Sequence, residues 1–305
     1  MRIFAPAILL FIFVFSGCSE KNLPKITIFE AAGFAPVTDI VIADAEKTLG
    51  LKIVTEASGT QVACRKLSEL GRRCDILISA DEKLFRELVP DQTSFRLDFA
   101  TDEIVLAFGQ RAKFADDVEK DWAMALFEKD VRLGRGDENL CPTGYRTLMV
   151  WQLQEKYANI AGFSDKLRSK STKVVDDVMH LAPLLKTGEI DYAFLYRSMC
   201  IVQDIRHIRL DKKINLGDMS TDYSAASVKL ANGKIVRGGP VIFSLSVPSN
   251  AENPISAYSF IIYLLTDKAG VIKTKGFTPI KPTFHGRNEL FKPFADLADF
   301  SDETI

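Results

Sequence analysis

Apolar runs alternate along the chain with segments in which apolar residues recur at helical spacing. The first part of this pattern predicts strands at 25–29, 51–55 and 75–79, with helices at 36–49 and 61–70 between them. Strands that alternate with helices of this length are typical of a mainly parallel sheet covered by helices. The pattern therefore predicts an α/β fold.

A second series of the same kind begins near Val131. Apolar residues at i, i+3, i+4 and i+7 from Val178 form one face of a helix, in which Pro183 is expected to cause a kink. The run 190–196 is almost wholly apolar, as in a strand buried on both faces. Shorter β segments follow at 227–230 and 241–247, and residues 231–234 are predicted to form a hairpin turn. We interpret the two series as two lobes.

The N-terminal segment is typical of an export signal. Met1-Arg2 gives a positive start, residues 8–15 are wholly apolar, and Ser16-Gly17-Cys18 then introduces small residues. The apolar part is too short to span a bilayer comfortably, and small residues before a cysteine resemble the lipobox of bacterial lipoproteins. We expect a signal peptide at 1–17, a lipid on Cys18 and a tether at 18–24. The alternative is an ordinary signal peptide that is cut a few residues later.

The rest of the chain is longer than one compact core usually holds, which again predicts two lobes. We place lobe I at 25–108 and 240–305 and lobe II at 109–239, with a ligand cleft between them. The 39 basic and 40 acidic residues are interspersed, so no whole-molecule field would attract nucleic acid or an anionic membrane. Binding selectivity must therefore come from a local site.

Small and hydroxyl-bearing residues fill the loops that follow the predicted strands, where open α/β sheets bind ligands. A helix that is entered through such a loop directs free N–H groups and its positive end toward an anion. The candidate ligand contacts are Ala32, Gly33, Ser58, Gly59, Thr60, Thr143, Gly144, Tyr145 and Tyr196. Taken singly, Ser58 or Thr143 could be a helix cap, and Tyr145 could pack on the sheet. Their convergence at one cleft favours an oxyanion site.

The segment 131–153 closely resembles a stretch of the periplasmic molybdate- and tungstate-binding proteins, the type II solute-binding proteins of ABC importers. In that family a Pro-x-Gly-Tyr-Arg run follows a strand, and here the run is Pro142-Thr143-Gly144-Tyr145-Arg146. The resemblance covers most of the chain after the signal. Other matching stretches lie at 58–71, 74–81, 99–107, 184–198, 214–218 and 279–282.

This resemblance implies the two-lobed periplasmic binding-protein fold of type II. It also implies a clamp that closes on tetrahedral tungstate or molybdate and delivers the ion to the permease of an ABC importer. We expect no enzymatic activity, no cofactor other than this bound ligand, and a location in the periplasm or at the cell surface. We also expect a monomer that contacts the membrane through its N-terminal lipid only and binds no nucleic acid.

Two positions depart from the family pattern. Some members also hold the metal through carboxylates, one of them just before the shared run, where this chain has Cys141; a second would have to come from 176–178. Phe34 stands where a hydroxyl residue is expected after Gly33. We therefore expect neutral donors and no direct protein–metal bond. Because of Phe34, another tetrahedral oxyanion such as sulfate or phosphate is the alternative ligand.

Four cysteines remain after Cys18, namely Cys64, Cys74, Cys141 and Cys200. An even count in an oxidising compartment favours disulfides. We expect a pair between Cys141 and Cys200, which follow strands ending at the same sheet edge, and a local pair between Cys64 and Cys74. The alternative is four buried free thiols.

The competing class of function is a thiol-dependent phosphatase that uses Cys141. The segment from Cys141 to Arg146 resembles the Cys-x5-Arg loop of such enzymes but is one residue short. Export to an oxidising compartment further disfavours a catalytic thiolate. The three histidines, His180, His207 and His285, stand in no motif. Binding is therefore the preferred interpretation.

Overall fold

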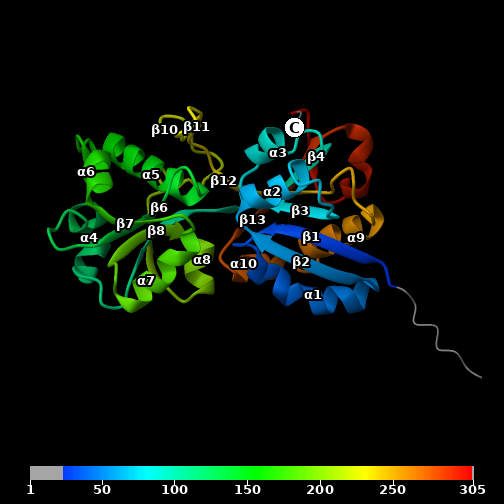
Figure 1. Ribbon diagram of the computed structural model, residues 1–305, viewed down its shortest axis with the longest axis horizontal. Helices are drawn as coiled ribbons and strands as arrows, with labels where there is room; N and C mark the ends of the chain where they lie inside the picture. Colours follow the sequence, from blue (N-terminus) through cyan, green and yellow to red (C-terminus); the bar gives the residue numbers. More distant parts are fainter. Residues whose placement is uncertain (1–22, 304–305) are drawn as a thin grey trace, which may run out of the picture.

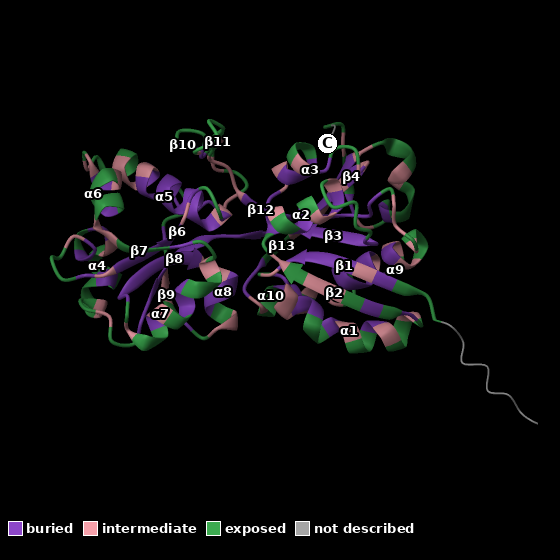
Figure 2. Cartoon of the chain, in the orientation of Figure 1, coloured by how far each residue is buried: buried purple, intermediate pink, exposed green. Residues whose placement is uncertain are grey.

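Two lobes lie side by side in the computed structural model, which describes residues 23–303 (Figure 1). The predicted signal peptide and the lipidation site at Cys18 lie outside the described residues. Each lobe is built on a sheet with helices on both faces, which confirms the predicted α/β architecture. The sheets are mixed, however, in place of the mainly parallel sheets predicted, because the strands near the lobe crossing, such as β12 (Val241–Ser246) and β5 (Ile104–Phe108), run antiparallel to their neighbours. Figure 2 shows that the central strands are buried and that the helices are exposed on their outward faces.

Lobe I contains a seven-stranded sheet in the order β14-β13-β4-β12-β3-β1-β2. Its strands are β1 (Lys25–Ala31), β2 (Lys52–Ser58), β3 (Ile76–Ser79), β4 (Phe95–Asp102), β12 (Val241–Ser246), β13 (Thr278–Gly286) and β14 (Asp299–Ser301). β1 pairs in parallel with β2 and β3, whereas β12 runs antiparallel to both β3 and β4. The returning chain therefore inserts β12 into the middle of the sheet against the direction of its neighbours.

Helices cover both faces of this sheet (Figure 1). They are α1 (Ala35–Leu49), α2 (Thr60–Ser68), α3 (Lys83–Leu88), α9 (Pro254–Leu265) and α10 (Ala269–Thr274), with 3₁₀ turns at Asn288–Leu290 and Lys292–Phe294. α2 and α3 pack on one face over an apolar cluster that includes Phe29 and Phe85, and α1 packs with α9 on the other. The start of α1 is close to the predicted one because Pro36 stands in its first turn, and Pro254 has the same place in α9.

Lobe II contains a five-stranded sheet in the order β7-β6-β8-β5-β9. Its strands are β5 (Ile104–Phe108), β6 (Leu133–Gly136), β7 (Ser171–Val175), β8 (Tyr192–Tyr196) and β9 (Arg206–Arg209). Its helices are α4 (Ala115–Ala125), α5 (Pro142–Ala158), α6 (Phe163–Lys170), α7 (Leu181–Thr187) and α8 (Arg197–Val202). A 3₁₀ turn at Val178–His180 precedes α7, so Pro183 lies in the first turn of a new helix, where proline is tolerated.

The predicted lobe boundary after residue 108 is wrong, because β5 belongs to the sheet of lobe II. β4 and β5 are separated by Glu103 alone, and the chain crosses between the lobes there. The segment around Asn215 and Leu216 lies beside this crossing. Ile104 N–H donates to the Asn215 carbonyl at 2.8 Å, and Val241 N–H, at the start of the strand that returns to lobe I, donates to the Leu216 carbonyl at 2.8 Å. Two continuous apolar strands joined by one residue give no turn signal, so the sequence could not locate this crossing.

A hairpin of β10 (Ser227–Lys229) and β11 (Ile235–Arg237) lies on the same side as α3 and α5 (Figure 1). Its tight turn contains Gly233 in the left-handed region at φ 86°, as predicted. The hairpin touches both lobes. Gln152 Nε2 of α5 donates to the Ser227 carbonyl at 2.9 Å, and Lys83 Nζ of α3 donates to the Arg237 carbonyl at 3.3 Å.

The predicted disulfides are not formed, because all four cysteines within residues 23–303 are free and buried. Cys64 and Cys74 share the apolar cluster beneath α2, where burial raises the pKa of each thiol to about 12. Cys200 lies in a separate apolar cluster of lobe II, whereas Cys141 Sγ lies 3.6 Å from the Asp137 carbonyl oxygen. The structure thus agrees with the alternative of buried thiols. Between residues 23 and 303, no helix has the length and apolar character needed to cross a membrane.

Candidate functional site

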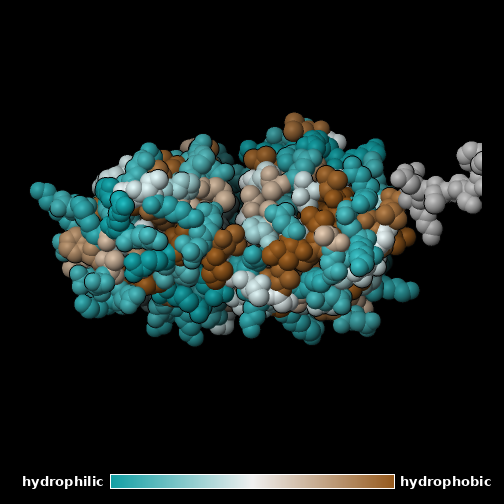
Figure 3. Space-filling model, turned by 90° about the horizontal axis from the view of Figure 1, so that it is seen from below, coloured by the Kyte–Doolittle hydropathy of each residue, from teal (hydrophilic) through white to brown (hydrophobic). Residues whose placement is uncertain are grey.

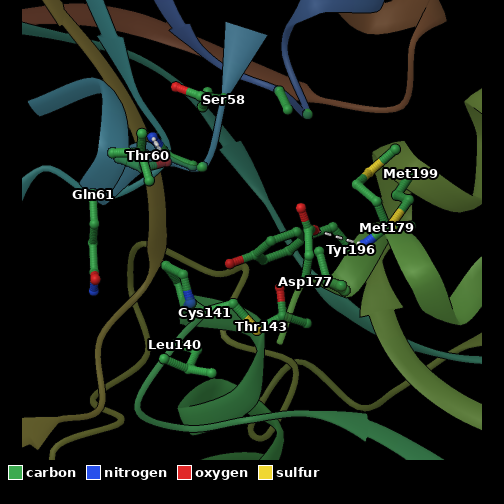
Figure 4. Close-up of a pocket in the computed structure, with 18 of the residues that line it drawn as sticks. Ser58, Thr60, Gln61, Leu140, Cys141, Thr143, Asp177, Met179, Tyr196 and Met199 are labelled. Atoms are coloured by element: carbon green, nitrogen blue, oxygen red, sulfur yellow. Dashed lines mark hydrogen bonds between the residues drawn. The ribbon is translucent and has the colours of Figure 1, made fainter. Parts of the chain in front are cut away.

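A cavity of about 390 Å³ opens between the two lobes (Figure 4). Apolar side chains surround the lobe junction on the face shown in Figure 3. Of the predicted contacts, the cavity lining includes Ala32, Gly33, Ser58, Gly59, Thr60, Thr143 and Tyr196. Gly144 and Tyr145 fall outside the lining. The structure thus brings together loops from both lobes at the predicted cleft.

The N-terminal turns of three long helices line this cavity. Pro36 of α1, Thr60 of α2 and Thr143 of α5 are all lining residues. The first amides of a helix have no partner within it, and the helix dipole places partial positive charge at the same end. Pro36 has no N–H, and the Val37 N–H donates to the Phe34 carbonyl at 2.8 Å, so α1 contributes its dipole rather than a free amide. The three helix ends together favour an anion in the cavity.

The helix-cap interpretation of Ser58 and Thr143 does not hold. The caps of α2 and α5 are Gly59 and Cys141, and within residues 23–303 neither makes a side-chain cap bond. Ser58 Oγ is buried without any hydrogen-bond partner in the described part of the chain. Thr60 Oγ1 accepts from Ala80 N–H at 3.4 Å, so the hydrogen of its hydroxyl stays available. Both hydroxyls are suited to donate to a ligand.

Tyr196 ends β8 and contributes the phenol of the lining. Its oxygen accepts a hydrogen bond from Arg146 NH1 at 2.5 Å. Burial raises the pKa of this phenol, although the neighbouring Arg146 and Thr143 act in the opposite direction. The protonated hydroxyl therefore retains one hydrogen that it can donate.

Gly144 and Tyr145, which were predicted to contact the ligand, lie outside the cavity lining and instead support the structure around it. A Cβ added at Gly144 would lie 2.3 Å from the Asp137 carbonyl oxygen, so only glycine lets α5 start this close to the preceding loop. The Tyr145 hydroxyl donates to Asp81 Oδ2 at 2.8 Å. The sequence predicted that Tyr145 donates to the anion because this residue stands at a helix start. Its position in the sequence does not reveal which way the ring points.

A buried ion pair lies behind the cavity. Arg146 NH2 of lobe II is 3.3 Å from Asp81 Oδ2 of lobe I, and the two side chains are 5% and 6% exposed. Burial by itself would raise the pKa of Asp81, but the Arg146 charge and the Tyr145 hydroxyl hold it below its usual value. The pair is therefore ionised, and its two charges offset each other beside the cavity.

Several lining residues were not among the predicted contacts. Arg65 of α2, Met199 of α8 and the Asp176-Asp177 pair after β7 all line the cavity. Asp177 Oδ1 accepts from Met179 N–H at 2.9 Å and so begins the 3₁₀ turn (Figure 4). These carboxylates follow a strand just as the other loops do, and that signal could have identified them. The sequence predicted neutral donors, so 176–178 counted only as a possible source of a carboxylate for the metal and these residues were not included among the contacts.

Phe34 and Cys141, the two departures from the family pattern, have different environments. Phe34 is fully buried and packs edge-on against Phe99, with ring centroids 5.3 Å apart, so it belongs to the core. Cys141 lines the cavity, and burial raises the pKa of its thiol to about 11. A thiol that stays protonated at neutral pH is a weak nucleophile. Arg146, which a phosphatase loop would need, is bound to Asp81 and Tyr196.

Comparisons with known proteins agree with the family resemblance. Residues 26–278 match the family described as bacterial extracellular solute-binding protein. The molybdate/tungstate-binding protein WtpA of Pyrococcus abyssi is 32% identical over 86% of this chain and 88% of that protein. Two solved structures share the fold. The periplasmic molybdate-binding protein of Azotobacter vinelandii has a TM-score of 0.56 at 16% identity, covering 83% of this chain and 98% of its own. The sulfate-binding protein SubI of Mycobacterium tuberculosis has a TM-score of 0.58 at 13% identity, and the match covers 91% of this chain and 94% of that protein.

Proposed function

Because the chain belongs to the bacterial extracellular solute-binding protein family, we propose that it captures tungstate or molybdate and delivers the ion to the permease of an ABC importer. The observation that carries this proposal is the meeting of three helix N-termini with the four hydroxyl groups of Ser58, Thr60, Thr143 and Tyr196 in one interlobe cavity. The name of the relative from Pyrococcus abyssi supports the choice of ion.

The proposed contacts are neutral hydrogen-bond donors. Ser58 and Thr60 supply hydroxyls from lobe I, and Thr143 and Tyr196 supply them from lobe II, beside the first amides of α2 and α5. Donors of this kind satisfy the oxygens of a tetrahedral dianion and still allow release when the lobes part. The protonated thiol of Cys141 is compatible with an ion that keeps its four oxygens. Asp176 and Asp177 are exposed, so water screens their charge from the bound ion.

The remaining expectations follow from the same role. We propose that Cys18 is lipidated after removal of residues 1–17 and that this lipid anchors a monomer at the cell surface or in the periplasm. The permease is the proposed protein partner. No catalytic residue or further cofactor is assigned.

Isothermal titration calorimetry of the purified protein with tungstate, molybdate, sulfate and phosphate tests the choice of ligand. Tungstate or molybdate should bind more tightly than sulfate and phosphate by roughly tenfold or more, which is about 1.4 kcal/mol. If the protein is saturated by sulfate or phosphate and by neither of the other two ions, the proposal fails.

Ser58→Ala tests the contact itself. Since the Ser58 hydroxyl has no partner within residues 23–303, its removal should leave the free energy of unfolding nearly unchanged. Tungstate binding should nevertheless weaken by about 1–3 kcal/mol, because one oxygen of the ion loses its donor. Ser259→Ala, at an exposed position on α9, is the matched control and should change neither quantity. Unchanged tungstate affinity in Ser58→Ala would remove Ser58 from the site.

A further inference from the structure

The backbone of Ala80 and the guanidinium of Arg146 connect hydroxyls of the two lobes. Ala80, which directly follows β3 in lobe I, donates its N–H to Thr60 Oγ1 at 3.4 Å. Its carbonyl accepts from Arg146 NH1 of α5 at 3.3 Å. The same nitrogen donates to the Tyr196 oxygen at 2.5 Å. Thr60 and Tyr196, from opposite lobes, are thus the two ends of one hydrogen-bonded chain.

The direction of these bonds determines what each end can do. At both ends the hydroxyl oxygen acts as the acceptor, toward Ala80 N–H for Thr60 and toward Arg146 for Tyr196. A hydroxyl has one hydrogen, and an oxygen already used as an acceptor tends to direct that hydrogen elsewhere. Both residues line the cavity. The chain therefore presents two donors, one from each lobe, to the cavity.

The guanidinium that holds this chain is itself fixed from both lobes. Arg146 NH2 pairs with Asp81 Oδ2 at 3.3 Å, and Tyr145 donates to the same carboxylate oxygen at 2.8 Å. The Arg146 guanidinium also lies over the rings of Tyr145 and Tyr196, at 5.7 and 5.8 Å from their centroids. Asp81 and Ala80 are in lobe I, while Arg146 and the two tyrosines are in lobe II. Opening the lobes would separate Asp81 and the Ala80 carbonyl from the lobe II side chains, whereas the contacts of Arg146 with the two tyrosines lie within lobe II and would remain.

We propose that Arg146 is a positioning residue that couples closure of the lobes to the alignment of the anion donors. It lies outside the cavity lining and acts through Tyr196 and through the Ala80 peptide. In this account, docking of Ala80 and Asp81 onto Arg146 fixes the closed state, and it brings the Thr60 hydroxyl, oriented by Ala80 in lobe I, to the same cavity as the Tyr196 hydroxyl, oriented by Arg146 in lobe II. The proposal rests on the proposed function for its ligand but makes a separate claim about lobe closure.

Arg146→Lys is the principal variant, because it keeps the positive charge and loses the planar fork that binds Ala80, Asp81 and Tyr196 at once. Tungstate titration by calorimetry should show a dissociation constant at least tenfold higher than that of the wild type. Small-angle scattering without anion should show a larger radius of gyration. Glu189→Gln is the matched control, since it breaks an exposed pair with Lys173 that lies within lobe II and should change neither value.

Further variants separate positioning from a loss of folding. Tyr196→Phe should weaken tungstate binding and leave the radius of gyration unchanged, since the Asp81 pair remains. The double variant Asp81→Asn with Arg146→Gln removes both charges of the buried pair, so it leaves no uncompensated buried charge. It replaces Arg146→Lys if that variant folds poorly, and it should show the same larger radius of gyration. Arg146→Lys with wild-type affinity and wild-type radius of gyration would overturn the proposal. If the wild type binds neither tungstate nor molybdate, the proposed function fails, whereas the scattering comparison still tests the coupling.

Discussion

The Tyr145 hydroxyl donates to Asp81 Oδ2 at 2.8 Å, and this bond joins the two lobes behind the ligand cavity. Both residues are buried. A carboxylate held by a phenol and a guanidinium in a dry environment makes a strong and directional contact. Tyr145 therefore belongs to the support of the site.

Tyr145→Phe should lower the free energy of unfolding by about 1.5–3 kcal/mol, the usual size for a hydrogen bond to a charged group. The tungstate dissociation constant should change less than in Arg146→Lys, because Arg146 still binds Asp81. Urea denaturation and calorimetry measure the two quantities. A large loss of affinity with no loss of stability would instead return Tyr145 to the ligand contacts.

Gly144→Ala should damage both stability and binding. The added Cβ would lie 2.3 Å from the Asp137 carbonyl, so the start of α5 would have to move away from the loop beside the cavity. Overpacking of this kind costs about 1–3 kcal/mol. Gly270→Ala is the control, because within residues 23–303 nothing lies within 4 Å of its new Cβ. Thermal denaturation of the two variants should separate them clearly; equal melting temperatures would contradict the packing argument.

Asp102→Asn should change how stability depends on pH. Asp102 ends β4 at the lobe crossing, and burial raises the pKa of its carboxyl to about 7 from 3.8. The folded protein therefore binds this proton more tightly than the unfolded chain does. The stability that protonated Asp102 contributes is complete at pH values below 3.8, the pKa in the unfolded chain, and is lost as pH rises through about 7.

The variant cannot ionise at this position. Its stability relative to wild type should therefore rise between about pH 4 and pH 7 and remain higher at alkaline pH. Asn also retains an acceptor for the Glu103 N–H bond, which is 2.8 Å long in the wild type. Urea titrations at several pH values measure the difference. Exposed Asp116→Asn is the control, and a parallel pH profile for Asp102→Asn and wild type would show that Asp102 carries no such linkage.

The cysteines should be recovered as thiols. Peptide mapping without reductant should find unmodified Cys64, Cys74, Cys141 and Cys200. Among these four, Cys141 lines the cavity, yet its reaction with maleimide at neutral pH should be slow, because burial raises the pKa of the thiol to about 11. Bound tungstate should slow it further. A peptide that links any two of these residues would contradict the structure.

Much of the fold could be predicted because apolar periodicity and local breakers act over short distances. The strand predicted at 51–55 overlaps the first four residues of β2, and the helix predicted at 36–49 matches α1 apart from one residue at its start. The crossing at Glu103 could not be predicted, since the sheet that a strand joins depends on contacts far away in the sequence.

The site was predictable at the level of its loops. Ser58, Thr60, Thr143 and Tyr196 reach the cavity because a loop after a strand has few alternative positions in such a sheet. The direction of individual side chains was not predictable. Tyr145 follows Thr143 by two positions on α5, which rotates it about half a turn, toward Asp81.

Anomalous diffraction at the tungsten absorption edge, on crystals grown with tungstate, tests the central claim most directly. We expect one strong peak inside the interlobe cavity, bounded by Ser58 and Thr60 on one side and by Thr143 and Tyr196 on the other. A tungsten peak confined to the outer surface, with the cavity free of metal at saturating tungstate, would contradict the account.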